Sequence, residues 1–184
     1  ANPLVFIRAQ SLGMKGNESA AEIDANKELC ATIEKIRSHA AVIFGLVDKP
    51  EDASRLSPYN PFFSIVSESS DYVTPDGKQI KYDSIDIVSR LLFMLKMHKT
   101  HPGTGTVCLG VAARIPGTIV NKLLKKEAHN REKIYIGHPA GIIPVESKVE
   151  EKEGSFHVTR AAIYRTARRI LDGNVYVKNT IINI

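Results

Sequence analysis

The sequence predicts an α+β domain in which a curled, mixed sheet surrounds one central helix. Residues 106–114 have helical character but are small and apolar on nearly every side. A helix without a polar face has to be surrounded by other elements. Several apolar runs of strand length, separated by turns that contain Gly and Pro, accompany this helix, and a longer amphipathic helix precedes it. Strands around the apolar helix, with the remaining helices outside, satisfy all three observations.

The first third of the chain predicts a strand, a helix and a second strand. Residues 3–9 contain the apolar run Leu4 to Ile7, which favours a strand. Ser19 and Glu22 have the spacing of a capping box, which begins a helix, and apolar residues then recur at helical spacing. The expected elements are a strand at 3–9, a helix at 20–39, a buried strand at 41–47 and a loop at 48–60.

The rest of the chain predicts strands on both sides of the apolar helix. Pro75-Asp76-Gly77 has the composition of a hairpin turn, and Ile115-Pro116-Gly117 ends the apolar helix. The expected elements before that helix are a strand at 62–67, a hairpin at 72–82 and an apolar strand at 85–95. Those expected after it are a helix at 118–126 and strands at 133–136, 142–149, 156–166 and 175–178.

Composition is typical of a globular protein with one domain. The chain has 184 residues, of which 43% are hydrophobic and 24% charged, and shows no internal repeat. Its longest apolar run, residues 85–95, is shorter than the roughly 20 residues of a membrane span. We recognise no targeting pattern and expect a cytoplasmic location. Because a core strand is predicted at the very beginning, we also expect the chain to be part of a longer one.

Cysteine, histidine and charge usage narrow the chemistry. Cys30 and Cys108 lie in apolar, helical stretches, where a thiol is usually structural. The six histidines show no metal-type spacing with them, so we expect no metal site. The net charge of +5 suits nucleic acid or small anionic substrates equally. Because no aromatic-flanked basic platform accompanies it, we favour an anionic substrate and expect no nucleic acid or membrane partner.

Residues 97–106, MHKTHPGTGT, carry the strongest functional signal. A turn rich in Gly and Thr leads into the apolar helix, and free amides at a helix start bind anions. Glycines let a ligand approach the backbone closely. Such a site holds a carboxylate and stabilises the enolate-like charge that forms when a proton leaves carbon. The alternative is that Gly103 and Gly105 only permit a tight turn, and the motif alone does not decide.

Two weaker motifs contribute candidate ligands. Gly137-His138-Pro139-Ala140-Gly141 is a rigid turn whose imidazole either orients a carboxylate, exchanges a proton or is simply solvated. Asn2 precedes Pro3 and is therefore held extended, so that its amide either faces a ligand or caps a strand. Arg114, at the end of the apolar helix, is chiefly structural, although it could also face a carboxylate.

Taken in order, these motifs resemble those of the PrpF family, which contains 2-methylaconitate cis-trans isomerase and methylitaconate delta-isomerase. The resemblance extends over essentially the whole chain. The matching positions are Asn2-Pro3 with Phe6, Gly13 and Glu18; Met97-His98 with Gly103-Thr104; Ile115-Pro116-Gly117-Thr118; Gly137-His138-Pro139 with Gly141; and Thr166-Ala167-Arg168 with Asp172-Gly173.

The resemblance implies a diaminopimelate-epimerase-like fold with two similar halves. Residues 1–184 would form a single domain, the carboxyl-terminal half, and their partner would be the amino-terminal half; a homo-oligomer is left open. The implied activity is a cofactor-independent allylic proton shift or cis-trans isomerisation of small unsaturated di- or tricarboxylates such as aconitate, methylaconitate or methylitaconate. In relatives the main acid and base, a lysine and a cysteine, lie in the amino-terminal half, so the catalytic residues remain unknown here.

The implied substrate-binding surface surrounds the start of the apolar helix. Met97 would pack against the substrate, and Asn2 and His138 would complete the rim. The residues expected to hold a carboxylate are His98, His101, Gly103, Thr104, Gly105 and Thr106.

Two positions depart from the family pattern. Pro102 stands where epimerase relatives have cysteine and where PrpF-like proteins often have methionine, and Ala1 replaces a glycine. This half therefore supplies no thiol at that position, and His101 is the nearby titratable group. The departure favours the alternative function, a non-catalytic accessory protein that retains the fold and the binding surface.

Overall fold

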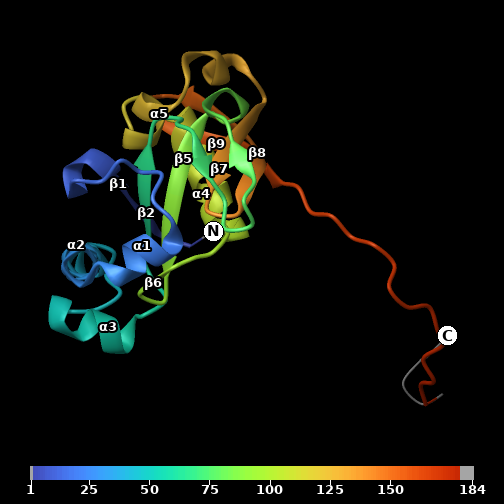
Figure 1. Cartoon of the computed structure of the whole chain (residues 1–184), viewed down its shortest axis with the longest axis horizontal. Helices are drawn as coiled ribbons and strands as arrows, with labels where there is room; N and C mark the ends of the chain where they lie inside the picture. The colour runs from blue at the N-terminus through green and yellow to red at the C-terminus, as the bar shows by residue number, and fades with distance from the viewer. Residues whose placement is uncertain (1, 179–184) are drawn as a thin grey trace.

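Helix α4 (Gly103–Arg114) lies inside a curled sheet, as the sequence predicts (Figure 1). The computed structural model describes residues 2–178. The sheet order is β1-β2-β5-β7-β8-β9, with β6 paired to β5; β1–β2 and β5–β7 are parallel and the other pairs antiparallel. The strands are β1 (Leu4–Arg8), β2 (Phe62–Ser67), β5 (Ile87–Phe93), β6 (Lys96–Met97), β7 (Lys133–His138), β8 (Gly141–Lys152) and β9 (Ser155–Ile163).

Strand β2 is buried on both of its faces, because helices cover both sides of this part of the sheet. Phe63 and Ile65 join one core cluster with Ile23 and Ile33 from the outer helices. Val66 points to the opposite face and joins the cluster around α4. The outer helices are α1 (Ala20–Ala25) and α2 (Lys27–Ile43).

The central helix keeps one partly accessible side, which corrects the expectation that every side is covered. Leu109 and Ala113 are fully buried, whereas Val107 and Val111, on the opposite side, are only half-buried. Helix α4 packs against β8, β9 and α5 (Ile119–Leu123). Because the sheet curls around part of the helix, an apolar stripe remains partly accessible.

The amino-terminal helical region differs from the prediction in two ways. The capping box of Ser19 and Glu22 is confirmed, but Asn26 interrupts the helix and caps α2 by accepting a hydrogen bond from the Leu29 amide at 3.0 Å. The strand predicted at 41–47 is wrong, because α2 continues to Ile43 and Gly45, with φ 68°, reverses the chain. A short apolar run does not distinguish a buried strand from a helix end.

Several smaller elements complete the body. The hairpin predicted at 72–82 is confirmed, whereas the strand predicted at 85–95 ends at Phe93 because Met94 and Leu95, with φ 53° and 62°, turn it into β6. The short strands are β3 (Tyr72–Val73) and β4 (Gln79–Ile80). The short helices are η1 (Ala9–Leu12), η2 (Pro50–Asp52), α3 (Ala53–Leu56), η3 (Tyr82–Ser84) and η4 (Lys126–Asn130).

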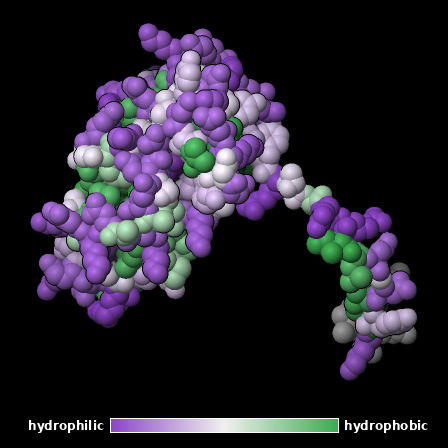
Figure 2. Space-filling view, in the orientation of Figure 1, coloured by the Kyte–Doolittle hydropathy of each residue, from purple (hydrophilic) through white to green (hydrophobic). Residues whose placement is uncertain are grey.

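After β9 the chain leaves the body as an extended tail, residues 164–178 (Figure 1). The strand predicted at 175–178 is wrong here, since the tail pairs with no strand among the described residues. Its large apolar side chains face solvent: Ile170 is 86%, Leu171 88% and Tyr176 94% exposed. Figure 2 shows this apolar surface along the tail. Over the described range, no helix combines the length and apolar character that crossing a membrane requires.

Truncation of Leu109 tests the one-sided burial of α4. We expect Leu109→Ala to lower the free energy of unfolding by about 2–5 kcal/mol, because a fully buried side chain leaves a cavity. Val107→Ala, on the partly accessible side of the same helix, should cost clearly less. Urea denaturation measures both; equal losses would contradict the asymmetry.

Candidate functional site

Three backbone amides at the start of α4 have no hydrogen-bond partner within the helix. Pro102 is the N-cap residue and offers no capping side chain. The amide of Thr106 donates to the Pro102 carbonyl at 2.8 Å, but Gly103, Thr104 and Gly105 precede the first intrahelical bond. Their N–H groups and the positive end of the helix dipole therefore favour an anion.

Asn2 lies beside this helix start although 102 positions separate it from Thr104. Its Nδ2 donates to Thr104 Oγ1 at 3.2 Å, and this contact is exposed. Strand β1, which follows Asn2, pairs with β2 in parallel and thereby brings the beginning of the chain to the sheet edge where α4 begins. The sequence prediction that these two residues lie on one rim agrees with this geometry.

His98 and His138 each have one ring nitrogen free to donate a hydrogen bond. His138 Nδ1 accepts from the Ala140 amide at 3.3 Å, and His98 Nδ1 accepts from the Thr100 amide at 3.1 Å. A neutral imidazole carries a single proton, which must then be on Nε2 in both rings. The two histidines thus present N–H donors.

Burial keeps His138 neutral. Desolvation lowers the pKa of His138 to about 4, and the positive charge of Arg90 acts in the same direction. At neutral pH this imidazole is therefore a hydrogen-bond donor and only a weak base.

His101 connects these parts but does not itself face a ligand. Its ring centroid is 6.5 Å from that of His138, and its Cε1 is 3.8 Å from where a Cβ on Gly105 would lie. Both ring nitrogens are engaged inside the protein, with Ser89 Oγ at 2.9 Å and Thr106 Oγ1 at 2.8 Å. Direct substrate binding by His101, as expected from the motif, does not fit this arrangement.

Three other expected ligands also lie below the surface. Met97 is buried in the core cluster with Ile23 and Phe63, so it packs against protein. Thr106 is fully buried. A Cβ on Gly105 would lie 2.5 Å from Leu91 Cδ1, so glycine is required for close approach to β5. Among these three residues, Gly105 alone contributes to the site, through its amide.

The structure adds one cation that the sequence motifs did not single out. A Cβ on Gly103 would lie 2.8 Å from Arg165 Nη2, just after the end of β9. The guanidinium therefore lies beside the helix start, where its charge reinforces that of the helix dipole. In the sequence, Arg165 lies in a stretch with Arg160, Arg168 and Arg169, and only the return of β9 towards α4 places it here.

Two other polar features and one thiol are less suited to the chemistry of an anion site. A hollow of about 510 Å³ is lined by three carboxylates, Glu18, Glu22 and Glu28, which repel an anion. Arg114 is structural, because its guanidinium donates to the carbonyls of Ala128, His129 and Ser147 among others. Burial raises the pKa of the Cys108 thiol, which disfavours a thiolate.

Comparison with known proteins identifies the family. The family model described as PrpF protein matches residues 1–178. The chain belongs to the PrpF family. It is 45% identical to 3-methylitaconate isomerase of Eubacterium barkeri over 97% of the chain and 46% of that protein. It is 33% identical to 2-methyl-aconitate isomerase of Shewanella oneidensis over 95% of the chain and 43% of that protein.

A solved structure supports the same assignment of fold. The crystal structure of a methylitaconate-delta-isomerase superposes with a TM-score of 0.86 at 44% identity, covering 97% of this chain and 45% of that one. The α+β fold with a sheet curled around α4 is therefore a PrpF fold. The chain spans less than half the length of each of these relatives.

The low pKa of His138 makes stability depend on pH. Its folded pKa, about 4, is below the ordinary value of 6.5, so the unfolded state binds the proton first as pH falls. The stability that the neutral His138 ring contributes is fully present above about pH 6.5 and is lost as the pH falls towards 4. Both proteins should lose stability between pH 7 and pH 5, but the free energy of unfolding of the parent protein should fall by about 2 kcal/mol more than that of His138→Gln. Parallel pH profiles in chemical denaturation would contradict a buried neutral His138.

Proposed function

We propose that the protein containing this chain is a cofactor-independent isomerase that moves an allylic proton, or isomerises the double bond, in small unsaturated di- or tricarboxylates. Hydrogen-bond donors at the start of α4, together with His98 and His138, which neighbour His101, carry this proposal. The donors are the amides of Gly103, Thr104 and Gly105, the Thr104 hydroxyl, the Asn2 amide, and the Nε2–H groups of His98 and His138.

The chemistry follows from what such donors stabilise. Removing a proton next to a carboxylate delocalises negative charge onto its oxygens, and donors fixed in advance stabilise that charge as it forms. The same groups bind the carboxylate of the ground state more weakly, which lowers the barrier. The acid and base that move the proton belong, in this proposal, to the amino-terminal half.

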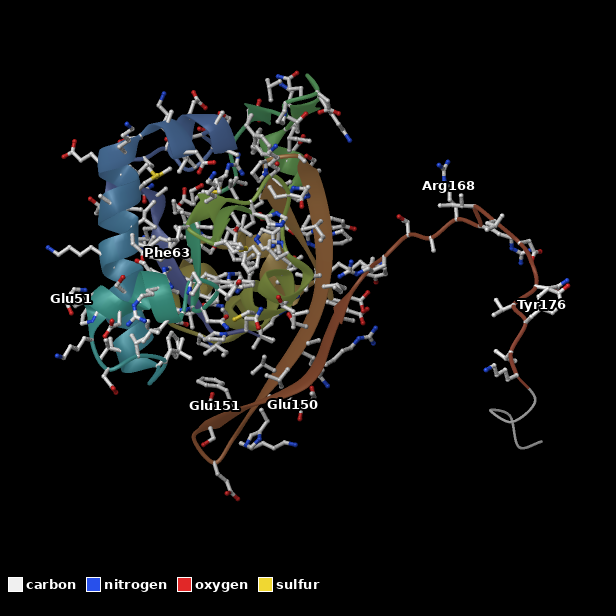
Figure 3. All side chains as sticks on the ribbon, turned by 90° about the horizontal axis from the view of Figure 1, so that it is seen from below. Glu51, Phe63, Glu150, Glu151, Arg168 and Tyr176 are labelled. Carbon is white, nitrogen blue, oxygen red and sulfur yellow. The ribbon has the colours of Figure 1, made fainter. Side chains whose placement is uncertain are left out.

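Two unpaired surfaces support a second half as partner. The side of α4 with Val107 and Val111 is only half-buried, and the tail exposes Ile170, Leu171 and Tyr176. In Figure 3 the labelled Arg168 and Tyr176 lie on the tail, away from the body. Together with a chain that spans 46% of its methylitaconate-isomerising relative, these surfaces favour residues 1–184 as the carboxyl-terminal half of one enzyme, for which we propose a cytoplasmic location.

The names of the relatives narrow the substrate class. The two relatives above are isomerases of 3-methylitaconate and 2-methylaconitate, both of which carry carboxylates on or beside a carbon–carbon double bond. We expect this protein to act on the same class. A rim of donors reads the charge of a carboxylate rather than its identity, so the geometry leaves the individual acid open.

Loss of the Thr104 hydroxyl tests the carboxylate site. We expect Thr104→Val in the full-length protein to weaken citrate binding about tenfold or more, because a hydrogen bond to a charged group is lost. Calorimetric titration with citrate measures the dissociation constant. Thr32→Val, at an exposed threonine on α2, is the control and should leave binding unchanged. Amide shifts on titration should cluster at Gly103–Gly105 and Gly137–Gly141; shifts confined to Arg160–Arg169 would contradict the site.

Separating the two halves tests the shared active site. We expect the full-length protein to convert methylitaconate or aconitate, and residues 1–184 alone to give no turnover above background, since the acid and base are missing. Ultraviolet absorbance of the conjugated acid follows the reaction. Robust turnover by residues 1–184 alone would contradict the shared site. Binding without turnover by the full-length protein would favour the accessory function.

A further inference from the structure

Two serine side chains are buried among apolar residues on the side of the sheet that faces α4. Ser64 lies on β2 and Ser89 on β5, and both are fully buried. A buried hydroxyl is costly unless it is hydrogen-bonded. Their oxygens lie 2.8 Å apart, and Ser89 Oγ continues to His101 Nε2 at 2.9 Å.

The hydrogen bonds of this network run in a single direction. Thr106 Oγ1 donates to the Pro102 carbonyl at 2.9 Å, because a carbonyl only accepts. With its proton used, Thr106 Oγ1 accepts from His101 Nδ1–H at 2.8 Å. A neutral His101 then has a bare Nε2, which accepts from Ser89 Oγ–H, and Ser89 in turn accepts from Ser64 Oγ–H. Each donor in the series has an acceptor.

We propose that His101 is a positioning residue that, as the neutral Nδ1–H tautomer, holds the first turn of α4 against β5. Through Thr106 it holds the carbonyl of Pro102, the N-cap residue of α4. This contact fixes the direction of the amides of Gly103 to Gly105. The proposal rests on the proposed function only in assigning those amides to a carboxylate. The tautomer and the helix start are properties of the fold.

Protonation would break the series. An imidazolium donates from both nitrogens, so Ser89 would have to turn its proton towards Ser64, and the Ser64 proton would need a new acceptor in the core. Burial lowers the pKa of His101 to about 3, and the neighbouring His138, His98 and Arg90 act in the same direction, since any positive charge on them repels an imidazolium. His101 is thus held as a structural donor rather than a proton carrier.

Nitrogen NMR of the full-length protein, labelled in its histidine rings, tests the tautomer without any assay of function. We expect His101 to show a protonated-type Nδ1 and a bare Nε2, unchanged between pH 8 and pH 5. A proton on Nε2, or double protonation within that range, would overturn the proposal.

A matched pair of serine variants tests the positioning role. Ser89→Ala and Ser64→Ala each remove one buried hydroxyl from adjacent strands, so a purely structural network predicts similar effects of both. We expect Ser89→Ala, which removes the donor to the ring, to raise KM for methylitaconate several-fold, while Ser64→Ala changes KM by less than about twofold. His101→Leu should raise KM about tenfold, the scale of one lost bond to a charged group, and His101→Asn, which keeps a donor near Nδ1, should recover part of the loss.

Equal KM values for the two serine variants would overturn the positioning role, even if both lower the melting temperature. Should the parent protein turn over no substrate, the proposed function fails, and the dissociation constant of citrate replaces KM in the same comparison. An unchanged citrate affinity in Ser89→Ala and His101→Leu would then overturn the positioning role independently. Should His101→Leu not fold, the comparison of Ser89→Ala with Ser64→Ala and the NMR measurement of the His101 tautomer still test the proposal.

Discussion

The close approach of α4 to the sheet is the constraint on which the rest of the structure depends. A Cβ on Gly105 would lie 2.5 Å from Leu91 on β5, and one on Gly110 would lie 2.7 Å from Val145 on β8. Glycine at both positions lets the helix backbone approach strands on two sides. The helix therefore begins at the edge of the sheet, and its first amides open where β1, β5 and β7 also bring side chains.

The same constraint explains why the site contains histidines that are neutral. His138 and His101 are buried against the helix start, and Arg90 lies close enough to lower the pKa of both rings. A charged imidazole in this position would be destabilised both by desolvation and by repulsion from Arg90. Neutral rings retain one N–H each, and the direction of that donor is set by what the other nitrogen accepts. The site thus gains oriented donors while Arg165, beside Gly103, supplies positive charge from the surface.

The sequence was informative where a local rule and the tertiary structure agree. The capping box at Ser19, the apolar helix and the union of Asn2 with the helix start were predicted, because cap spacing and helix composition act locally and the family motifs supplied the rest. The strand predicted at 41–47 failed because apolar character alone does not select strand over helix. The substrate contact predicted for Met97 was wrong because its side chain is buried in the core, and this burial, like the roles of Ser64 and Ser89, could not be predicted because it depends on which way each strand face points. A serine within an apolar strand is the one signal that could have pointed to the network.

The candidate site therefore has two layers, an exposed rim and a buried hydrogen-bond network, and the two affect a ligand in different ways. Asn2 and Thr104 meet at an exposed contact, where water competes with any carboxylate and weakens each hydrogen bond. His101 and Thr106 are buried, so their hydrogen bonds to each other and to the protein do not depend on what binds at the surface. In the proposed enzyme, a second half that covers the rim would expel this water, and hydrogen bonds to a forming negative charge strengthen as the local dielectric falls. The buried layer then fixes where the donors point, and the covering half determines how strongly they act. The partly accessible apolar stripe of α4 and the rim therefore belong to one interface, because the surface that buries Val107 and Val111 must also come within reach of Thr104 on the same side of the helix.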